Sequence, residues 1–124
     1  EEALYKHAGI IRTAKGYKGM AVVNSEGGVL ASDIPGGTQL DFSNVAQALS
    51  NMYTDCSKHL SRKGLGGCRG LSLNTDHGII ILQGTDFYTG GNYRFMVLIA
   101  EDGNGFFAQT QLKAIIPRIL HEIS

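Results

Sequence analysis

The amino-acid sequence predicts an α/β fold in which helices cover both faces of a five-stranded antiparallel sheet. The strongest indication is an uninterrupted apolar run at residues 95–100 (Phe-Met-Val-Leu-Ile-Ala), which has the length and composition of a strand. Because its residues do not alternate between apolar and polar, both faces of this strand must be covered, as at the centre of a sheet. A second indication is the order of the predicted elements, α-β-β-α-β-β-β-α, with glycine-containing turns between the strands.

Length and composition are typical of one folded domain spanning residues 1–124. Hydrophobic residues make up 43% and charged residues 18% of the 124 positions, which is ordinary for a globular protein. The chain has 11 Lys and Arg residues and 11 Asp and Glu residues, and this balance argues against a nucleic-acid binder. No apolar run approaches the ~20 residues of a membrane span, so we expect no direct membrane insertion.

The two cysteines, Cys56 and Cys68, are too few for a disulfide scaffold or a cysteine-based metal site. We expect two reduced and buried thiols, one on a helix and one in a strand. Reduced thiols and the lack of a signal-peptide pattern favour a cytoplasmic location.

The chain is predicted to begin with a helix at residues 2–15. Leu4, Ala8 and Ile11 lie on one helical stripe, as expected for a helix packed on a sheet. Gly9 inside this segment weakens the helix by about 1 kcal/mol relative to alanine.

A tight antiparallel hairpin follows, with strands at 19–24 and 29–32. The Ser-Glu-Gly-Gly sequence between them tolerates the positive φ angles that short turns require. Residues 34–39 contain a proline and two glycines, and we expect them to form a loop.

The middle helix is predicted to begin at a cap on Asp41 or Ser43 and to end near Lys63. Its apolar face is broad, with a core stripe widened on one side: Val45, Leu49, Met52, Cys56 and Leu60, together with Phe42, Ala46 and Tyr53. A face of this width is expected to contact the sheet and something else as well.

The second half of the chain predicts three strands and a last helix. The strands span 68–73, 79–82 and 95–100, with turns at 75–78 and 86–92. The helix begins at Phe106 or Phe107 and carries leucine and isoleucine at helical spacing. Because Pro117 removes one backbone hydrogen bond, we expect a kink there or two shorter helices.

The hairpin at residues 18–32 resembles the first hairpin of the roadblock/LC7 superfamily. In that family an apolar strand meets an Asn/Asp-x-Asp/Glu-Gly turn, here Asn24 to Gly27, and returns as a second strand that ends in Ala/Lys-Ser, here Ala31 and Ser32. The strand at 95–100, the Asn-Gly loop after it and the final helix are also similar. The chain departs from the family pattern in the second glycine of its turn and in the glycine-rich segment 64–70.

This resemblance implies a sheet in the order 2-1-5-4-3, with the middle helix on one face and the terminal helices on the other. It also implies a dimer, homo- or heteromeric, in which the third strand pairs with its counterpart in a second roadblock-type subunit and the middle helices pack together. An open sheet edge and a helix with spare apolar surface favour the same arrangement.

The predicted interface residues come from the middle helix and the third strand: Val45, Leu49, Met52, Tyr53, Cys56, Cys68, Arg69, Gly70, Leu71, Ser72 and Leu73. Tyr53 is expected to be an interface anchor, because tyrosine is enriched in binding hot spots. A proline in place of Leu71 is expected to break the edge pairing at modest cost to the monomer.

The function that the resemblance implies is a non-enzymatic scaffold or adaptor. Its partner would be a small Ras-like GTPase or a larger GTPase-regulating or motor assembly, with recruitment to an endomembrane or cytoskeletal complex. The alternative is a small-molecule sensor of the profilin-like or PAS-like type, which would need a cavity with convergent polar groups.

Residue patterns for catalysis or cofactors are weak. The glycines of 64–70 connect a helix to a strand, which is the reverse of the order in a phosphate-binding loop. Asp55 and His59 are four residues apart on one helix, a spacing that more often makes a surface hydrogen bond than a metal site. No nucleophile motif is present, so we predict no catalytic, cofactor or metal site.

Overall fold

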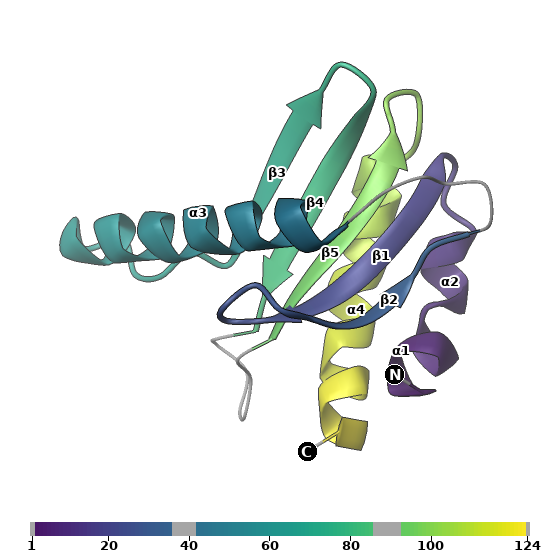
Figure 1. Ribbon diagram of the computed structural model, residues 1–124, viewed down its shortest axis with the longest axis horizontal. Coiled ribbons are helices and arrows are strands. Elements are labelled where there is room, and N and C mark those ends of the chain that lie inside the picture. The colour runs from purple at the N-terminus through teal and green to yellow at the C-terminus, as the bar shows by residue number, and fades with distance from the viewer. Residues whose placement is uncertain (1, 36–41, 86–92, 124) are drawn as a thin grey trace.

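The computed structural model describes residues 2–35, 42–85 and 93–123 (Figure 1). The helices of these ranges are α1 (Glu2–His7), α2 (Gly9–Arg12), α3 (Phe42–Arg62) and α4 (Gly105–Ile123). The strands are β1 (Tyr17–Asn24), β2 (Val29–Asp33), β3 (Gly70–Thr75), β4 (Gly78–Gly84) and β5 (Tyr93–Ala100).

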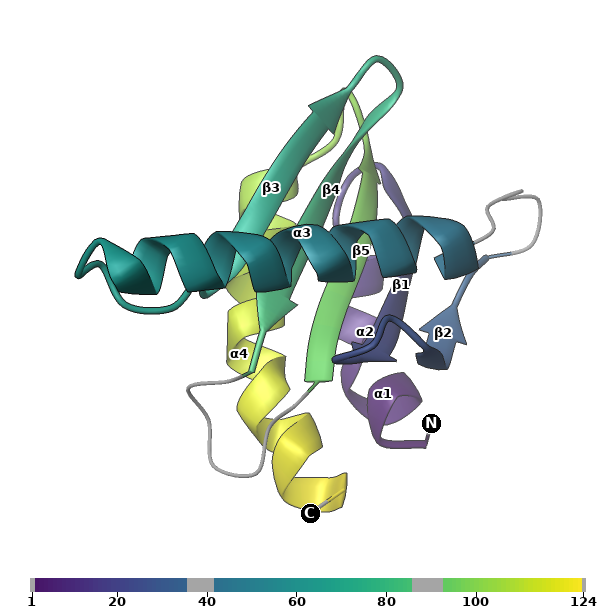
Figure 2. The ribbon, with the colours of Figure 1, turned by 60° about the vertical axis from the view of Figure 1, so that its left-hand side comes forward.

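The five strands form one antiparallel sheet in the order β2-β1-β5-β4-β3. The strand that contains the apolar run, β5, therefore lies in the middle, as predicted. Helix α3 crosses one face of the sheet, and α1, α2 and α4 lie against the other (Figures 1 and 2). The predicted fold class and strand order are confirmed.

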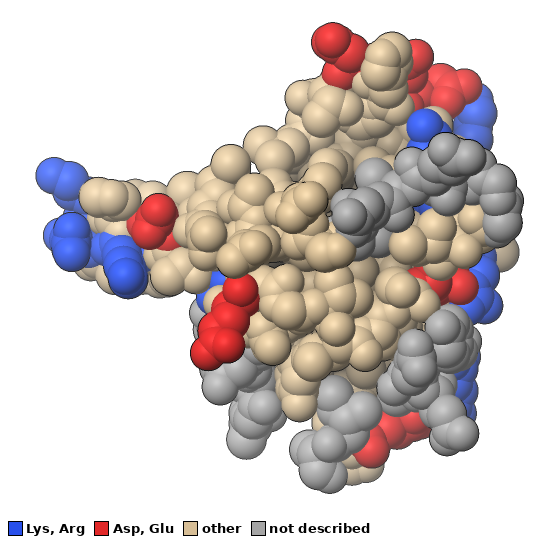
Figure 3. Space-filling model, in the orientation of Figure 1, with Lys and Arg blue, Asp and Glu red and all other residues tan. Residues whose placement is uncertain are grey.

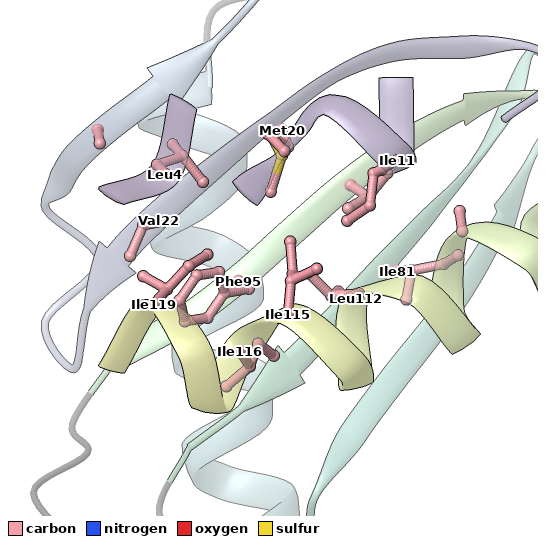
Figure 4. Close-up of a cluster of buried hydrophobic side chains, with 14 of the residues drawn as sticks. Leu4, Ile11, Met20, Val22, Ile81, Phe95, Leu112, Ile115, Ile116 and Ile119 are labelled. Atoms are coloured by element: carbon pink, nitrogen blue, oxygen red, sulfur yellow. The ribbon is translucent and has the colours of Figure 1, made fainter. Parts of the chain in front are cut away.

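Successive residues of β5 enter two different cores. Phe95, Val97 and Ile99 point into a large cluster with α1, α2 and α4, part of which is drawn in Figure 4. Met96 points the other way, into a smaller cluster beneath α3. Both faces of the strand are buried, which explains why its sequence is apolar without alternation.

The predicted first helix is broken, because α1 ends at His7 and α2 begins at Gly9. Ala8 lies between them, and its carbonyl still accepts a hydrogen bond from the Arg12 amide at 3.1 Å. The expected stripe of Leu4, Ala8 and Ile11 is buried nevertheless. Gly9, a poor helix former next to the break, is the sequence feature that accounts for it.

Strand β3 begins at Gly70, two residues after the predicted start at Cys68. The backbone of Cys68, just before β3, bonds to side chains of α3. Its amide donates to the Ser57 hydroxyl at 3.0 Å, and its carbonyl accepts from the Tyr53 hydroxyl at 2.5 Å. These bonds fix the segment that returns from α3 to the sheet.

Helix α4 runs without interruption through Pro117, so the alternative of two shorter helices is wrong. Pro117 is exposed, whereas Ile116 and Leu120 are buried against the sheet side of the helix. Packing on that side holds both halves in one helix despite the missing hydrogen bond. The kink that proline favours stays a prediction.

The second part of the predicted first helix ends at Arg12, three residues before the expected end at residue 15, and the other predicted boundaries lie within two residues of the observed ones. The loop at 36–39, the cap on Asp41 and the turn at 86–92 lie outside the described residues. None of the helices in the described ranges is long and apolar enough to cross a membrane.

Asp33, the last residue of β2, links the sheet to α2. Its Oδ2 accepts hydrogen bonds from Arg12 Nε at 2.8 Å and from the Tyr17 hydroxyl at 2.6 Å. The hydrogen bond from Arg12 is the largest cause that lowers the pKa of Asp33 below its ordinary value. Burial raises the pKa of the Tyr17 phenol, so this hydroxyl remains a donor at physiological pH.

We expect Asp33→Asn to destabilise the fold by about 1 kcal/mol at neutral pH. A carboxylate with a depressed pKa in the folded state stabilises the fold above its unfolded pKa, and this contribution is lost as the pH falls through the folded pKa. The difference between wild type and variant in urea unfolding should therefore shrink between about pH 7 and about pH 2. Glu101→Gln, in an exposed loop, is the control, and a pH-independent difference for Asp33→Asn would contradict the assignment.

Candidate functional site: a sheet edge and an overhanging helix

Strand β3 forms one edge of the sheet, and among the described residues it pairs only with β4. The Gly84 amide donates to the Arg69 carbonyl at 2.9 Å, so these two residues form a hydrogen-bonded antiparallel pair. Such pairs alternate along a ladder. The backbone groups of Leu71 therefore point to β4, whereas those of Gly70, Ser72 and Asn74 point away from the sheet.

This alternation corrects the expected effect of proline at Leu71. The change would remove a hydrogen bond to β4 and would damage the monomer itself. Ser72 is the residue at which proline removes an outward-pointing amide and leaves the bonds between β3 and β4 in place.

Helix α3 extends beyond the edge strand. It crosses the sheet at a steep angle to the strands, and its second half continues past β3 in both views (Figures 1 and 2). Lysine and arginine side chains gather at the overhanging end, where Lys58, Arg62 and Lys63 lie in the sequence (Figure 3). The second half of α3, a long amphipathic helix, therefore does not lie over the sheet of this chain.

A mostly apolar groove of about 640 Å³ runs between α3 and β3. Residues from both elements line it: Ala48, Asn51, Met52, Asp55, Cys56, His59, Leu60, Cys68, Gly70 and Leu71. Met52 is 42% exposed although it lies on the apolar side of the helix. The groove gives the edge strand an apolar border.

The structure separates the predicted interface residues into two groups. Leu49, Tyr53 and Cys68 are buried in the chain's own core beneath α3, although Cys68 also lines the groove beside β3. The remaining ones are at least partly accessible: Val45, Met52, Cys56, Arg69, Gly70, Leu71, Ser72 and Leu73. The interface as a whole stays a prediction.

Two apolar residues near this surface were not predicted as part of it. Ile80 and Leu98 are register partners on neighbouring strands, and Ile80 is also paired with Leu73 of the edge strand. All three are only half-buried, because α3 does not extend over this end of the sheet. Leu98 is two residues after Met96 and therefore shares its face of the sheet, and this alternation along β5 is a sequence signal that could have found it.

Arg94 is a second residue whose environment the sequence did not indicate. Its side chain is 5% exposed and lies beneath α3. Nη1 donates to the Ser50 carbonyl at 2.7 Å and to the Ser50 hydroxyl, and the guanidinium carbon lies 4.6 Å from the centre of the Tyr53 ring. A buried cation of this kind is stabilised by the ring face and by neutral acceptors.

Acidic, histidine and cysteine side chains do not gather into a metal-binding group of three or more within the described ranges. Asp55 and His59 both line the groove beside β3.

Comparison with solved structures identifies the fold. No protein-family model matches the sequence, and no curated protein matches it. The chain has the roadblock/LC7 fold, as the sequence resemblance implied. It is similar to the roadblock/LC7 domain from Streptomyces avermitilis, with a TM-score of 0.78 over 96% of this chain and 95% of that one at 13% identity.

Two further structures are similar. MglB in a tetrameric arrangement gives a TM-score of 0.76 at 12% identity, over 98% of this chain and 87% of that one. Profilin II from Acanthamoeba castellanii gives a lower TM-score of 0.56 at 15% identity, over 98% of both chains. At these identities the likeness establishes the fold alone.

Proposed function

We propose that this chain is a non-enzymatic adaptor that dimerises through β3 and α3 and presents the resulting platform to another protein. The observation that carries the proposal is the outward-pointing backbone of β3 beside an apolar groove and an overhanging helix. An open strand edge is a template for another strand, and exposed apolar surface favours a partner.

A two-fold axis beside the outer edge of β3 and perpendicular to the sheet would complete both the open strand edge and the overhanging helix. It pairs β3 with its counterpart in antiparallel register and inverts the second subunit. The overhanging half of α3 then falls on the end of the partner's sheet that the partner's own α3 leaves uncovered. The half-buried residues at that end are Leu73, Ile80 and Leu98. A self-complementary surface of this type is what a two-fold dimer requires.

The second subunit has the same fold and is either a copy of this chain or a related roadblock-type protein. Self-association is a property of one similar structure, MglB in its tetrameric arrangement. By the family resemblance, the protein bound by the dimer is a small Ras-like GTPase or a GTPase-regulating or motor assembly. We place this activity in the cytoplasm, in agreement with the reduced state of Cys56 and Cys68.

Light scattering coupled to size-exclusion chromatography tests whether the chain forms a dimer. We expect twice the mass of one chain at micromolar concentration, and a monomer would exclude a stable homodimer. Affinity capture from native lysate, with Met52→Asp as the comparison, tests whether the dimer binds another protein. A GTPase or motor subunit captured by the wild type and lost with the variant would support the proposal, and capture independent of Met52 would contradict the platform.

A further inference from the structure

A polar pocket lies on the side of α3 opposite the groove described above. Its volume is about 510 Å³, and it is lined by Tyr53, Thr54, Ser57, Lys58, Ser61, Arg62 and Arg94. The lining contains three cations and three aliphatic hydroxyl groups, but no carboxylate among the described residues. In a chain with a net charge of zero, this is a local concentration of positive charge. We propose that this pocket binds the phosphate group of a small molecule.

Arg94 supplies the buried cation of the site. Nη1 bonds to neutral oxygens of Ser50 and lies 3.3 Å from the carbonyl of Ser25, while Nε has no hydrogen-bond partner among the described residues. A buried donor without an acceptor is unfavourable, and a buried cation without an anion is more so. A bound oxyanion would supply both an acceptor for Nε and a negative charge, neither of which the described residues provide.

The helix places two further donors side by side. Lys58 and Ser61 are three residues apart and therefore share a side of α3, whereas the Thr54 hydroxyl beside them donates to the Ser50 carbonyl at 3.0 Å and is not available to a ligand. Ser57 accepts a hydrogen bond from the Cys68 amide through its oxygen, which leaves its hydroxyl proton to donate elsewhere. Lys58 and Arg62 are exposed at the rim.

Phosphate fits this arrangement better than a carboxylate does. Its two negative charges and three terminal oxygens accept several charge-assisted hydrogen bonds at once, from a planar guanidinium and from flexible ammonium and hydroxyl groups. The volume is within the range of about 300–1,000 Å³ of small-molecule sites, so an organic group attached to the phosphate can also be accommodated. This inference does not depend on the dimer or its protein partner.

The Nε–H signal of Arg94 in a ¹H–¹⁵N NMR spectrum reports directly on the site. We titrate the wild type with inorganic phosphate, with adenosine monophosphate as a phosphate monoester, and with acetate at equal ionic strength. Both phosphates should shift this signal saturably, and acetate should leave it in place. Arg94→Lys identifies the signal by its loss; if this variant does not fold, the rim variants below decide the question.

Lys58→Ala and Arg62→Ala should each weaken phosphate binding about tenfold, because each removes a charge-assisted hydrogen bond. Lys63→Ala is the matched control, since it removes the same charge from the same helix end but does not line the pocket. Its effect should stay below about twofold. Equal losses in all three variants would mean general attraction to a basic helix end and would overturn the proposal.

Two other results would also overturn it. Binding of acetate as strong as that of phosphate would assign the pocket to carboxylates. Asp86 lies in the part of the chain that the structure does not describe. Its carboxylate is an alternative partner for Arg94, which Asp86→Asn tests. If this variant moves the Arg94 signal without added ligand, and the wild type does not bind phosphate, the carboxylate of Asp86 occupies the site.

Discussion

Gly84→Ala should destabilise the fold by about 1–3 kcal/mol, because the added methyl group has no room. A Cβ at this position would meet the Tyr53 ring, with one ring carbon at 3.0 Å and the hydroxyl and its ring carbon closer still. The backbone of Gly84 does not have a positive φ angle, so the constraint is space alone. Glycine at the end of β4 is what leaves room for the Tyr53 ring between the helix and the sheet.

Tyr53 is not free to move away from a new methyl group. Its hydroxyl is bonded to the Cys68 carbonyl at 2.5 Å, and its ring lies under the Arg94 guanidinium. The side chain is fully buried. Shifting the ring would break the bond that fixes the segment after α3 and would leave the buried cation without its aromatic contact.

Urea unfolding of a double-mutant cycle measures this coupling. In a Tyr53→Ala background, where the ring is absent, the cost of Gly84→Ala should fall to about a few tenths of a kcal/mol. Gly9→Ala is the control, because no atom lies within 4 Å of the added carbon and its φ angle is not positive. We expect it to be neutral or to stabilise α2 by up to about 1 kcal/mol. An unchanged cost of Gly84→Ala without the ring would show that Tyr53 is not the obstacle.

The sequence predicts the fold well where short-range patterns decide it. The hairpin turn after Asn24 and the apolar run in β5 are local signals, and together they place the central strands. The start of β3 is different, because the Cys68 backbone is bonded to side chains 15 and 11 residues earlier in the chain. A contact of that range has no signature in the neighbouring residues.

Arg94 shows the same limit at the candidate site. The sequence marks it as a charge that precedes the apolar run, which is the usual place for a solvated residue. Counting back from Met96 in steps of two puts it on the face covered by α3, but nothing local indicates that the helix extends that far. The central strand, apolar from residue 95 onward, therefore has a buried cation at its second position, and this cation lines a polar pocket.

Ser72→Pro should weaken the proposed dimer about a hundredfold while the monomer stays folded. Proline removes the outward-pointing amide and adds bulk at the strand edge, and a hundredfold loss of affinity corresponds to about 3 kcal/mol. The bonds between β3 and β4 are kept, because by the ladder alternation they involve Leu71 and Leu73. Proline is tolerated in an edge strand for this reason.

Three comparison variants make the result specific to the backbone of the edge. Ser72→Ala removes the same hydroxyl but keeps the amide, so its dimer should match the wild type. Leu71→Pro should lower the stability of the monomer in urea unfolding, which Ser72→Pro should not. Met52→Asp tests the contribution of α3 to the interface, because it places a charge in the apolar groove between α3 and the edge strand β3. If Met52→Asp gives monomers and Ser72→Pro keeps the wild-type dissociation constant, the subunits associate through α3 alone and the sheet does not continue across the interface.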